Sequence, residues 1–320
     1  MKKLIFLAAA MALVLPACSP AGATRNDPLA GPYRVLSAKE IFAEAPQYKP
    51  GDDLKTFIGK RLDWAFAPGR PPLATMDPEA DLWRDKTITA DQVMAAETAL
   101  TAEGHKAARL ITALNGGGGA AEVMQQLIAE GYEPAQIFEG GFEASMGDTP
   151  EAKATREKLR KLAPRYPIAK LILGLSLVDL PSLTDKAEGI QFLSELHDVD
   201  ALMLQTVVTS LYFMEPHQPQ ADKVARQMLE AYAKVMPDML KNGEPVMQRA
   251  TFALGQLLED GRGGPKDADR AAAIYTTLVD TTHPTCEPDA AAGLMRLGKP
   301  VPEGKGRPCA AEGPPPQPMQ

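Results

Sequence analysis

The chain has 320 residues and a formal net charge of −7 at pH 7, with 45% hydrophobic and 23% charged residues. That length suits one large domain or two ordinary ones, and the composition is that of a soluble globular protein. The acidic balance argues against nucleic acid as a partner, because phosphate binding requires a basic surface. Only 6% of the residues are aromatic, so we expect a core of small and aliphatic side chains.

The first 17 residues have the features of a secretory signal peptide. Lys2 and Lys3 precede an apolar run over residues 4–15, and small residues follow. The apolar run is too short to span a bilayer as a mature helix. We therefore expect residues 1–17 to be removed on export.

The sequence "LPAC", which ends at Cys18, resembles the lipobox of bacterial lipoproteins. In that family the cysteine receives a diacylglycerol thioether, the peptide is cut before it, and the new amine is acylated. The resemblance implies a lipid anchor at Cys18, and Ser19 after it implies the outer membrane, facing the periplasm. Several acyl chains at about 0.8 kcal/mol per buried CH2 hold a protein firmly. Ordinary secretion, with Cys18 discarded or free, is the alternative.

The chain has three cysteines. With Cys18 lipidated, Cys286 and Cys309 form an even pair, and in an oxidising compartment such a pair is a disulfide by default. A metal site is the alternative, but only His283 lies close to this pair in the sequence. In the chain-entropy model a loop of this length contributes roughly 3 to 4 kcal/mol. We expect the bond to close the C-terminal end of the helical region.

Two segments precede the main body. Residues 18–32 are rich in proline, glycine and small residues, which indicates a flexible tether. Residues 33–88 form an irregular N-terminal arm in which "AKEIFAEAP" and "DDLKTFIGKRLDWAFAP" indicate short helices. The arm contains Trp64, Phe66 and Trp83, which we expect to dock it onto the body.

Residues 89–309 show apolar residues at helical spacing, with glycines and prolines between short helices. This predicts an all-α fold, and a chain of short helices is first tested for internal repeats. The segment that starts at Ala169 matches the one that starts at Ala250, and residues 201–232 and 107–132 match more weakly. The final residues, 310–320, are proline-rich, which indicates a disordered tail.

The clearest repeat, residues 250–278, contains "ALGQLLEDGRGGPKDADRAAAIY" and resembles a Sel1-like repeat, a relative of the tetratricopeptide repeat. The family pattern has an A-x-x-x-LG helix, a turn with G-x-G-x-P-x-D, and a second helix with A-x-x-x-Y. The resemblance implies an α-solenoid of antiparallel helical hairpins. The residues that match the pattern are Ala250, Leu254, Gly255, Gly261, Gly263, Pro265, Asp267, Ala271 and Tyr275.

The matching residues also have mechanical roles. Gly255 inside a helix costs about 1 kcal/mol relative to alanine, which is acceptable where another helix must come close. Gly261 suits the left-handed conformation that ends a helix. Pro265 cannot continue that helix, and Asp267 can cap the next one. Tyr275 is expected to fill the space beside its partner helix.

Two glycine-rich stretches raise the question of anion binding. "GRGGPKDAD" lacks the Lys-Ser/Thr pair of a P-loop and follows a helix, so we interpret it as a turn in which Arg262 and Lys266 are solvated. "NGGGG" precedes a helix whose amides offer an anion site, but a flexible connection is the favoured interpretation.

No sequence pattern indicates catalysis or a cofactor. G-x-S-x-G and H-E-x-x-H motifs are absent from the sequence, and neither remaining cysteine is expected to be a free thiol. The adjacent acids Glu259 and Asp260 leave a paired-carboxylate hydrolase open as a remote alternative. Surface roles are expected for all four histidines, which are His105, His197, His217 and His283.

These features predict a non-catalytic scaffold lipoprotein that holds partner proteins in an envelope assembly. "QQLIAEGYEPAQIFEGGF" is similar to repeats of lipoproteins that serve alginate export, which implies a role in exopolysaccharide synthesis or export. The alternative is a carbohydrate- or peptidoglycan-binding lipoprotein that contacts polysaccharide directly. Contact with the membrane is expected through the lipid anchor only.

Overall fold

The computed structural model describes residues 33–78, 82, 88–116, 119–241, 248–280 and 288–302. Over these residues the protein has fifteen helices and two strands of two residues each. The predicted all-α class is therefore confirmed. Within the same ranges, no helix combines the length and the apolar character that crossing a membrane requires.

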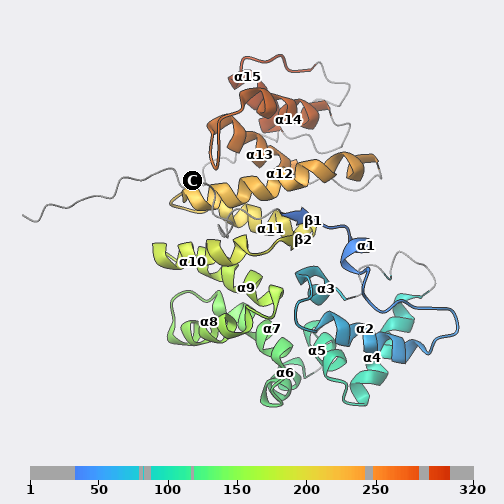
Figure 1. The fold of residues 1–320 in the computed structure, drawn as a ribbon. Coiled ribbons are helices and arrows are strands. Elements are labelled where there is room, and N and C mark those ends of the chain that lie inside the picture. The colour runs from blue at the N-terminus through green and yellow to red at the C-terminus, as the bar shows by residue number, and fades with distance from the viewer. Residues whose placement is uncertain are drawn as a thin grey trace, which may run out of the picture.

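The N-terminal part is a group of helices around its own buried apolar cluster. The cluster includes Phe57, Ile58, Leu62, Leu110 and Leu127, contributed mainly by α2, α4, α5 and α6. Figure 1 shows α2, α4 and α5 together at one side of the molecule. The elements of this part are β1 (Arg34–Val35), α1 (Ala38–Ile41), α2 (Leu54–Ala65), α3 (Pro72–Met76), α4 (Ala90–Ala102), α5 (Lys106–Leu114) and α6 (Ala120–Ala129).

The rest of the chain is a succession of helix pairs. Helix α7 packs against α8, α9 against α10, α11 against α12 and α13 against α14, and α15 packs on α14. These pairs follow one another from α7 and α8 to α15 (Figure 1). The elements are α7 (Glu133–Ala144), α8 (Pro150–Leu162), α9 (Pro167–Val178), α10 (Leu183–Ser194), β2 (Asp198–Val199), α11 (Ala201–Tyr212), α12 (Pro219–Lys241), α13 (Gln248–Asp260), α14 (Ala268–Asp280) and α15 (Pro288–Arg296).

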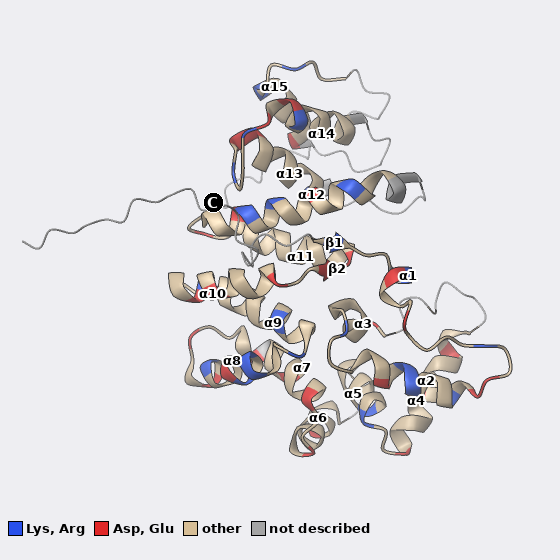
Figure 2. Ribbon diagram, in the orientation of Figure 1, with Lys and Arg blue, Asp and Glu red and all other residues tan. Residues whose placement is uncertain are grey.

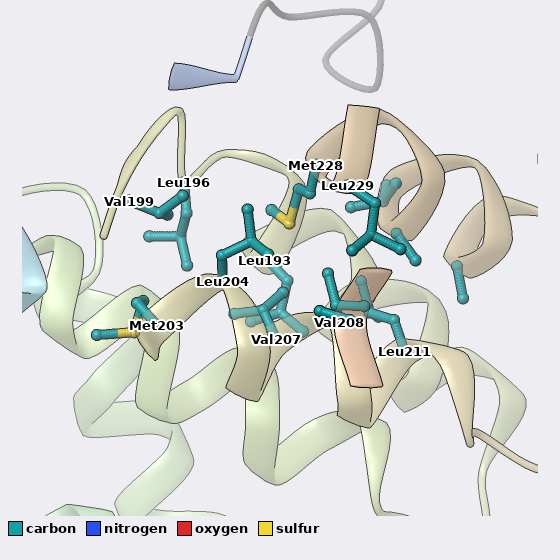
Figure 3. Packing of buried hydrophobic residues seen from close by; sticks show 14 of the residues in the cluster. Leu193, Leu196, Val199, Met203, Leu204, Val207, Val208, Leu211, Met228 and Leu229 are labelled. Atoms are coloured by element: carbon teal, nitrogen blue, oxygen red, sulfur yellow. The ribbon is translucent and has the colours of Figure 1, made fainter. Parts of the chain in front are cut away.

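One continuous apolar cluster runs through these pairs. It extends from Ile137 on α7 to Leu294 on α15 and consists mostly of leucine, alanine and valine, as the composition predicts. In Figure 3 one face of α11, which includes Leu204 and Val208, points toward Met228 of α12. The inward face of α11 is therefore buried against other helices of the same chain.

Short polar residues start many of these helices. Thr89 and Gln92 form a capping box at α4, and the Thr149 side chain accepts a hydrogen bond from the third residue of α8. The Ser182 side chain does the same at α10, and that of Asp200 at α11. Such caps satisfy N–H groups that have no partner within the helix, so the helix starts follow directly from the local sequence.

The N-terminal arm joins the body at the connection between α10 and α11. Strand β1 pairs in parallel with β2, and the side chain of Arg34 forms an ion pair with Asp198 at 2.8 Å. The buried Tyr33 hydroxyl donates a hydrogen bond to the Ser194 carbonyl oxygen at 3.0 Å. The chain that follows residue 32 is thus attached near the middle of the succession of pairs.

Of the three aromatic residues that we expected to dock the arm onto the body, Phe66 does so and Trp64 does not. The Phe66 ring packs edge-on against Phe138 of α7, with ring centroids 6.2 Å apart. Trp64 packs within the arm, against Phe42, at 5.8 Å. Trp83 lies outside the described residues. Phe66 therefore contacts the body, and Tyr33, which the sequence did not single out, adds a contact at the connection between α10 and α11.

Candidate functional site

The glycine-rich turn 261–267 joins α13 and α14. Gly261 and Gly263 have φ values of +74° and +70°, a region that is sterically costly for residues with side chains. The Asp267 carboxylate accepts a hydrogen bond from the Arg270 N–H at 3.0 Å, which caps the start of α14. The turn therefore ends one helix and begins the next, as the sequence indicates.

The same turn packs tightly against the preceding helix pair. A Cβ atom on Gly263 would lie 2.3 Å from the backbone oxygen of Asp222 on α12. The buried Arg226, also on α12, donates hydrogen bonds to the carbonyl oxygens of Pro265 at 2.8 Å and Arg262 at 3.3 Å. The turn therefore forms a contact between the α11–α12 pair and the α13–α14 pair, which we call the joint. Its backbone carbonyl oxygens accept the hydrogen bonds across this contact.

Arg262 forms the other half of this joint. Its guanidinium binds both carboxylate oxygens of Asp222, at 2.6 and 3.1 Å, and lies 4.9 Å from the ring centroid of Tyr212. The hydrogen bond to Asp222 raises the pKa of Arg262. The expectation that Arg262 is solvated is wrong, because α12 supplies a carboxylate partner from outside the turn. Lys266 is exposed, as expected.

Tyr275 lies between two helices that approach it through glycine. A Cβ atom on Gly255 of α13 would lie 2.3 Å from the Tyr275 ring, and one on Gly293 of α15 would lie 2.5 Å from it. Ala271, one turn before Tyr275, is fully buried. Glycine at position 255 is thus required by the close approach of an aromatic ring, which is the reason that the sequence suggested.

The Glu259 carboxylate is bound by two side chains. The Tyr275 hydroxyl donates to it at 2.8 Å, and Arg296 on α15 donates to both of its oxygens at 3.0 Å. The hydrogen bond from Arg296 lowers the pKa of Glu259, and burial raises the pKa of Tyr275. Glu259 is buried and Asp260 is exposed, so the two neighbouring acids lie in different surroundings.

A cationic side chain recurs at the C-terminal end of the first helix of a pair. The sequence alone did not indicate this feature. Arg156 donates to the carbonyl oxygens of Ala144, the last residue of α7, and of Gly147 just after it, both at 2.8 Å. The Lys186 ammonium donates to the Val178 oxygen at the end of α9 at 2.7 Å. Arg262 donates to the Tyr212 oxygen at the end of α11 at 3.4 Å. Helix C-termini carry unpaired carbonyls and partial negative charge, so these cations stabilise them.

The histidines of the described part have local roles. His105 accepts a hydrogen bond from the Ala108 N–H at the start of α5, and the His197 ring packs against Tyr33 at 5.8 Å. His217 is exposed and lies beside Arg262. The described residues contain no group of three or more His, Cys, Asp or Glu side chains that could hold a metal ion.

Several predicted features lie outside the described residues. These include the signal peptide, the tether and the proline-rich tail, and the residues Cys18, Cys286, Cys309 and His283. The lipid anchor and the disulfide therefore stay predictions from the sequence.

A polar depression between α8 and α10 carries charges that are paired with one another. Its lining includes Lys153 and Arg156, which both pair with Asp148, at 3.0 and 3.6 Å. Arg160 in the same lining binds both carboxylate oxygens of Glu188 at 2.7 Å. These cations lie on α8 of the first helix pair, and Arg160 connects that helix to α10 of the second pair.

The outer side of α11 is an uncharged surface. Residues 201–214 contain no Asp, Glu, Lys or Arg, and Figure 2 shows α11 free of charged segments while α8 carries many. Leu202 is 66% exposed and Phe213 is 69% exposed. We call the four exposed residues of this helix and its C-cap the α11 face: Leu202, Thr206, Thr209 and Phe213.

The C-terminal end of the α11 face lies beside α13. The Phe213 ring packs edge-on against Tyr212, with centroids 4.9 Å apart, and the Tyr212 hydroxyl donates to Gln256 on α13 at 2.5 Å. Residues 250–258 of α13 also lack charged side chains, but within this segment only Phe252 and Gln256 are partly exposed. Of these uncharged residues, the four of the α11 face are the exposed ones.

No family model, curated protein or solved structure matches this chain. The resemblance to Sel1-like repeats consequently depends on the residues of this sequence alone.

Proposed function

We propose that the protein is a non-catalytic scaffold lipoprotein of the bacterial outer membrane, facing the periplasm. Its body would be an α-solenoid of Sel1-like helical pairs that binds other envelope proteins. By the resemblance of residues 125–142 to repeats of alginate-export lipoproteins, exopolysaccharide synthesis or export is the specific process that we propose.

The α11 face is the observation that supports binding most directly. An exposed helix stripe normally carries charged residues, as the outer side of α8 does with Glu157, Lys158 and Lys161. On the α11 face, in contrast, Leu202 and Phe213 are both about two-thirds exposed. Exposed apolar patches rimmed by polar residues are typical of interaction sites.

The packing of the pairs supports the solenoid. Repeat proteins bury each pair against its neighbours in sequence, so each junction between pairs needs dedicated contacts. The turn at 261–267 supplies such contacts through Gly263 and Arg226. In the α9–α10 pair, Gly174 and Gly189 bring two helices into close contact, because a Cβ on Gly189 would lie 2.9 Å from the Gly174 oxygen.

Photo-cross-linking in cells tests this proposal. A photoreactive amino acid at Thr206 is expected to form adducts with specific envelope proteins, because that position lies at the centre of the α11 face. The same amino acid at Lys158, exposed on the charged side of α8, is the matched control. If the two positions capture the same abundant bystanders, the α11 face is not a binding surface.

A carbohydrate- or peptidoglycan-binding function is the second candidate. The exposed Phe213 ring favours it, since aromatic rings offer a flat apolar surface. Co-sedimentation of the purified protein with sacculi separates the two functions. Sedimentation that Phe213→Ala abolishes would favour the glycan binder, and a protein that stays in the supernatant would favour the scaffold.

A further inference from the structure

Residues 33–36, which we call the strap, connect the N-terminal helices to the middle of the body. The N–H groups of Arg34 and Leu36 donate hydrogen bonds, both at 2.8 Å, to backbone oxygens of the connection between α10 and α11. The Tyr33 hydroxyl donates a third hydrogen bond, to the Ser194 oxygen at the end of α10. The strap is therefore attached directly before the helix that carries the α11 face.

The strap is bonded to the residues that position the start of α11. Strand β2 ends at Val199, which is buried and accepts one of the hydrogen bonds from the strap. The next residue, Asp200, is the N-cap of α11. Its carboxylate accepts a hydrogen bond from the Met203 N–H at 3.0 Å, and its carbonyl oxygen accepts one from the Leu204 N–H at 2.9 Å. Because Leu202 of the α11 face lies in this first turn, a movement of β2 reaches the face through the cap.

Few interactions hold the strap in place. Its ladder has two residues on each strand, and the ion pair between Arg34 and Asp198 is exposed on both sides, where ion pairs stabilise little. Tyr33 is its buried side chain. The chain that follows enters a separate apolar cluster, which contains Ile41 and Phe42. Segments with few buried contacts open locally more easily than the whole fold opens, so the strap can leave β2 while the helices on either side stay folded.

We propose that the strap is a release device: a pull on the tether peels β1 from β2, which loosens the cap of α11 and weakens binding at the α11 face. Residues 18–32 are the predicted tether, and β1 is the first element after them, so a pull between membrane and body reaches the strap first. The inference rests on the proposed function, because it regulates the same binding surface. Coupling between two sites is reciprocal, so a partner on the α11 face makes the strap harder to peel.

A disulfide between the two strands tests whether the strap holds the start of α11. Val35 and Val199 are register partners, and the spacing of neighbouring strands lies within the range that a disulfide spans. In purified full-length V35C/V199C protein, oxidation should slow amide hydrogen exchange of Met203 and Leu204 at least tenfold. Wild-type protein under the same oxidising and reducing conditions is the control, because it contains the native cysteines. Unchanged exchange at both amides would contradict the coupling.

Tyr33→Ala tests the opposite direction, because it removes the buried ring of the strap. Exchange at Met203 and Leu204 should rise at least tenfold, and capture of envelope proteins by a photoreactive residue at Thr206 should fall several-fold. Lys39→Ala, at an exposed position of α1, is the matched control and should change neither. An equal rise of exchange in α13 would mean that the whole fold is destabilised and that the strap is not a separate unit.

Single-molecule pulling tests the release itself. With handles at residue 19 of the tether and at Lys158 on α8, an early extension step of about 14 Å is expected, since four residues are freed at ~3.4 Å each. Oxidised V35C/V199C protein should lack that step, and reduction should restore it. Absence of the step in wild type, or its persistence in the oxidised variant, would overturn the release device.

The outcomes distinguish this inference from the proposed function. If the residue at Thr206 captures specific envelope proteins and Tyr33→Ala does not alter that capture, the release device is wrong and the scaffold stands. If Thr206 in otherwise wild-type protein captures nothing beyond the Lys158 control, the proposed function fails. Regulation of the α11 face then fails with it, even where exchange shows that the strap holds α11.

Discussion

Tyr275 has a glycine on each side of its ring, and this arrangement explains two residues that helix propensity disfavours. Both Gly255 and Gly293 are helical, where glycine costs about 1 kcal/mol relative to alanine. Any side chain at either position would overlap the ring. The aromatic contact therefore fixes glycine at both positions.

Gly255→Ala should destabilise the fold by about 1–3 kcal/mol, because overpacking of a buried contact outweighs the gain in helix propensity. Gly141→Ala on α7 is the matched control, since its Cβ would lie at an ordinary 3.5 Å from Ile172. Chemical denaturation of both variants measures the difference. Equal stability of the two variants would contradict the contact.

Glu259→Gln should lower the free energy of unfolding at pH 7 by roughly 1–3 kcal/mol, because it weakens charge-assisted hydrogen bonds to a buried carboxylate. Arg296 lowers the pKa of Glu259 in the folded state below its unfolded value near 4.3. The ionised group therefore stabilises the fold above about pH 4.3, and this contribution is lost as the pH falls through the lowered pKa.

Denaturation curves of Glu259→Gln and wild type should therefore converge as the pH is lowered from neutral into the acid range. Glu157→Gln is the control, because Glu157 is exposed in its ion pair with Arg160. A stability difference that stays constant from pH 7 to acid would show that ionised Glu259 is not what stabilises this cluster.

At the level of elements, the sequence predicts where helices begin and end better than it predicts which residues they contact elsewhere in the chain. Helix ends could be predicted because Gly261 and Asp267 act within a few residues of their own position. The role of Arg262 could not, since its partner Asp222 is distant in the sequence. The α11 face was also missed, because its periodic Leu202 and Phe213 resemble core positions until the packing of α11 is known.

The joint between α12 and the turn 261–267 gives a prediction at this scale. Arg262→Met should speed amide hydrogen exchange in the turn and destabilise the protein by about 2–4 kcal/mol, because it leaves the largely buried Asp222 without its partner. Lys266→Met, at an exposed position of the same turn, should change neither. Exchange rates that rise equally in both variants would exclude a joint that depends on Arg262.

At the level of the whole molecule, the attachment point of the arm sets how the body meets the membrane. Strand β1 is fixed at β2, near the middle of the helix pairs. If Cys18 carries lipid, the tether of residues 18–32 spans at most ~50 Å when extended. The body would then be held close to the bilayer by its middle, with both ends free to meet partners.

Cys18→Ala should move the protein from the membrane fraction to the soluble periplasmic fraction, because the acyl chains are the proposed anchor. Immunoblots of fractionated cells measure this directly, with Cys286→Ala as a control for loss of a cysteine elsewhere. Retention of the Cys18→Ala variant in membranes would mean that another element anchors the chain.

The most direct test of the proposed scaffold is quantitative identification of the proteins isolated with wild type and with Phe213→Asp from cross-linked cells. The charge would oppose an apolar contact on the α11 face, so we expect a specific set of envelope proteins to be lost. Leu183→Asp, which places the same charge at an exposed position of α10, is the control and should retain that set. The same partners in the same amounts from all three proteins would contradict a scaffold that binds through α11.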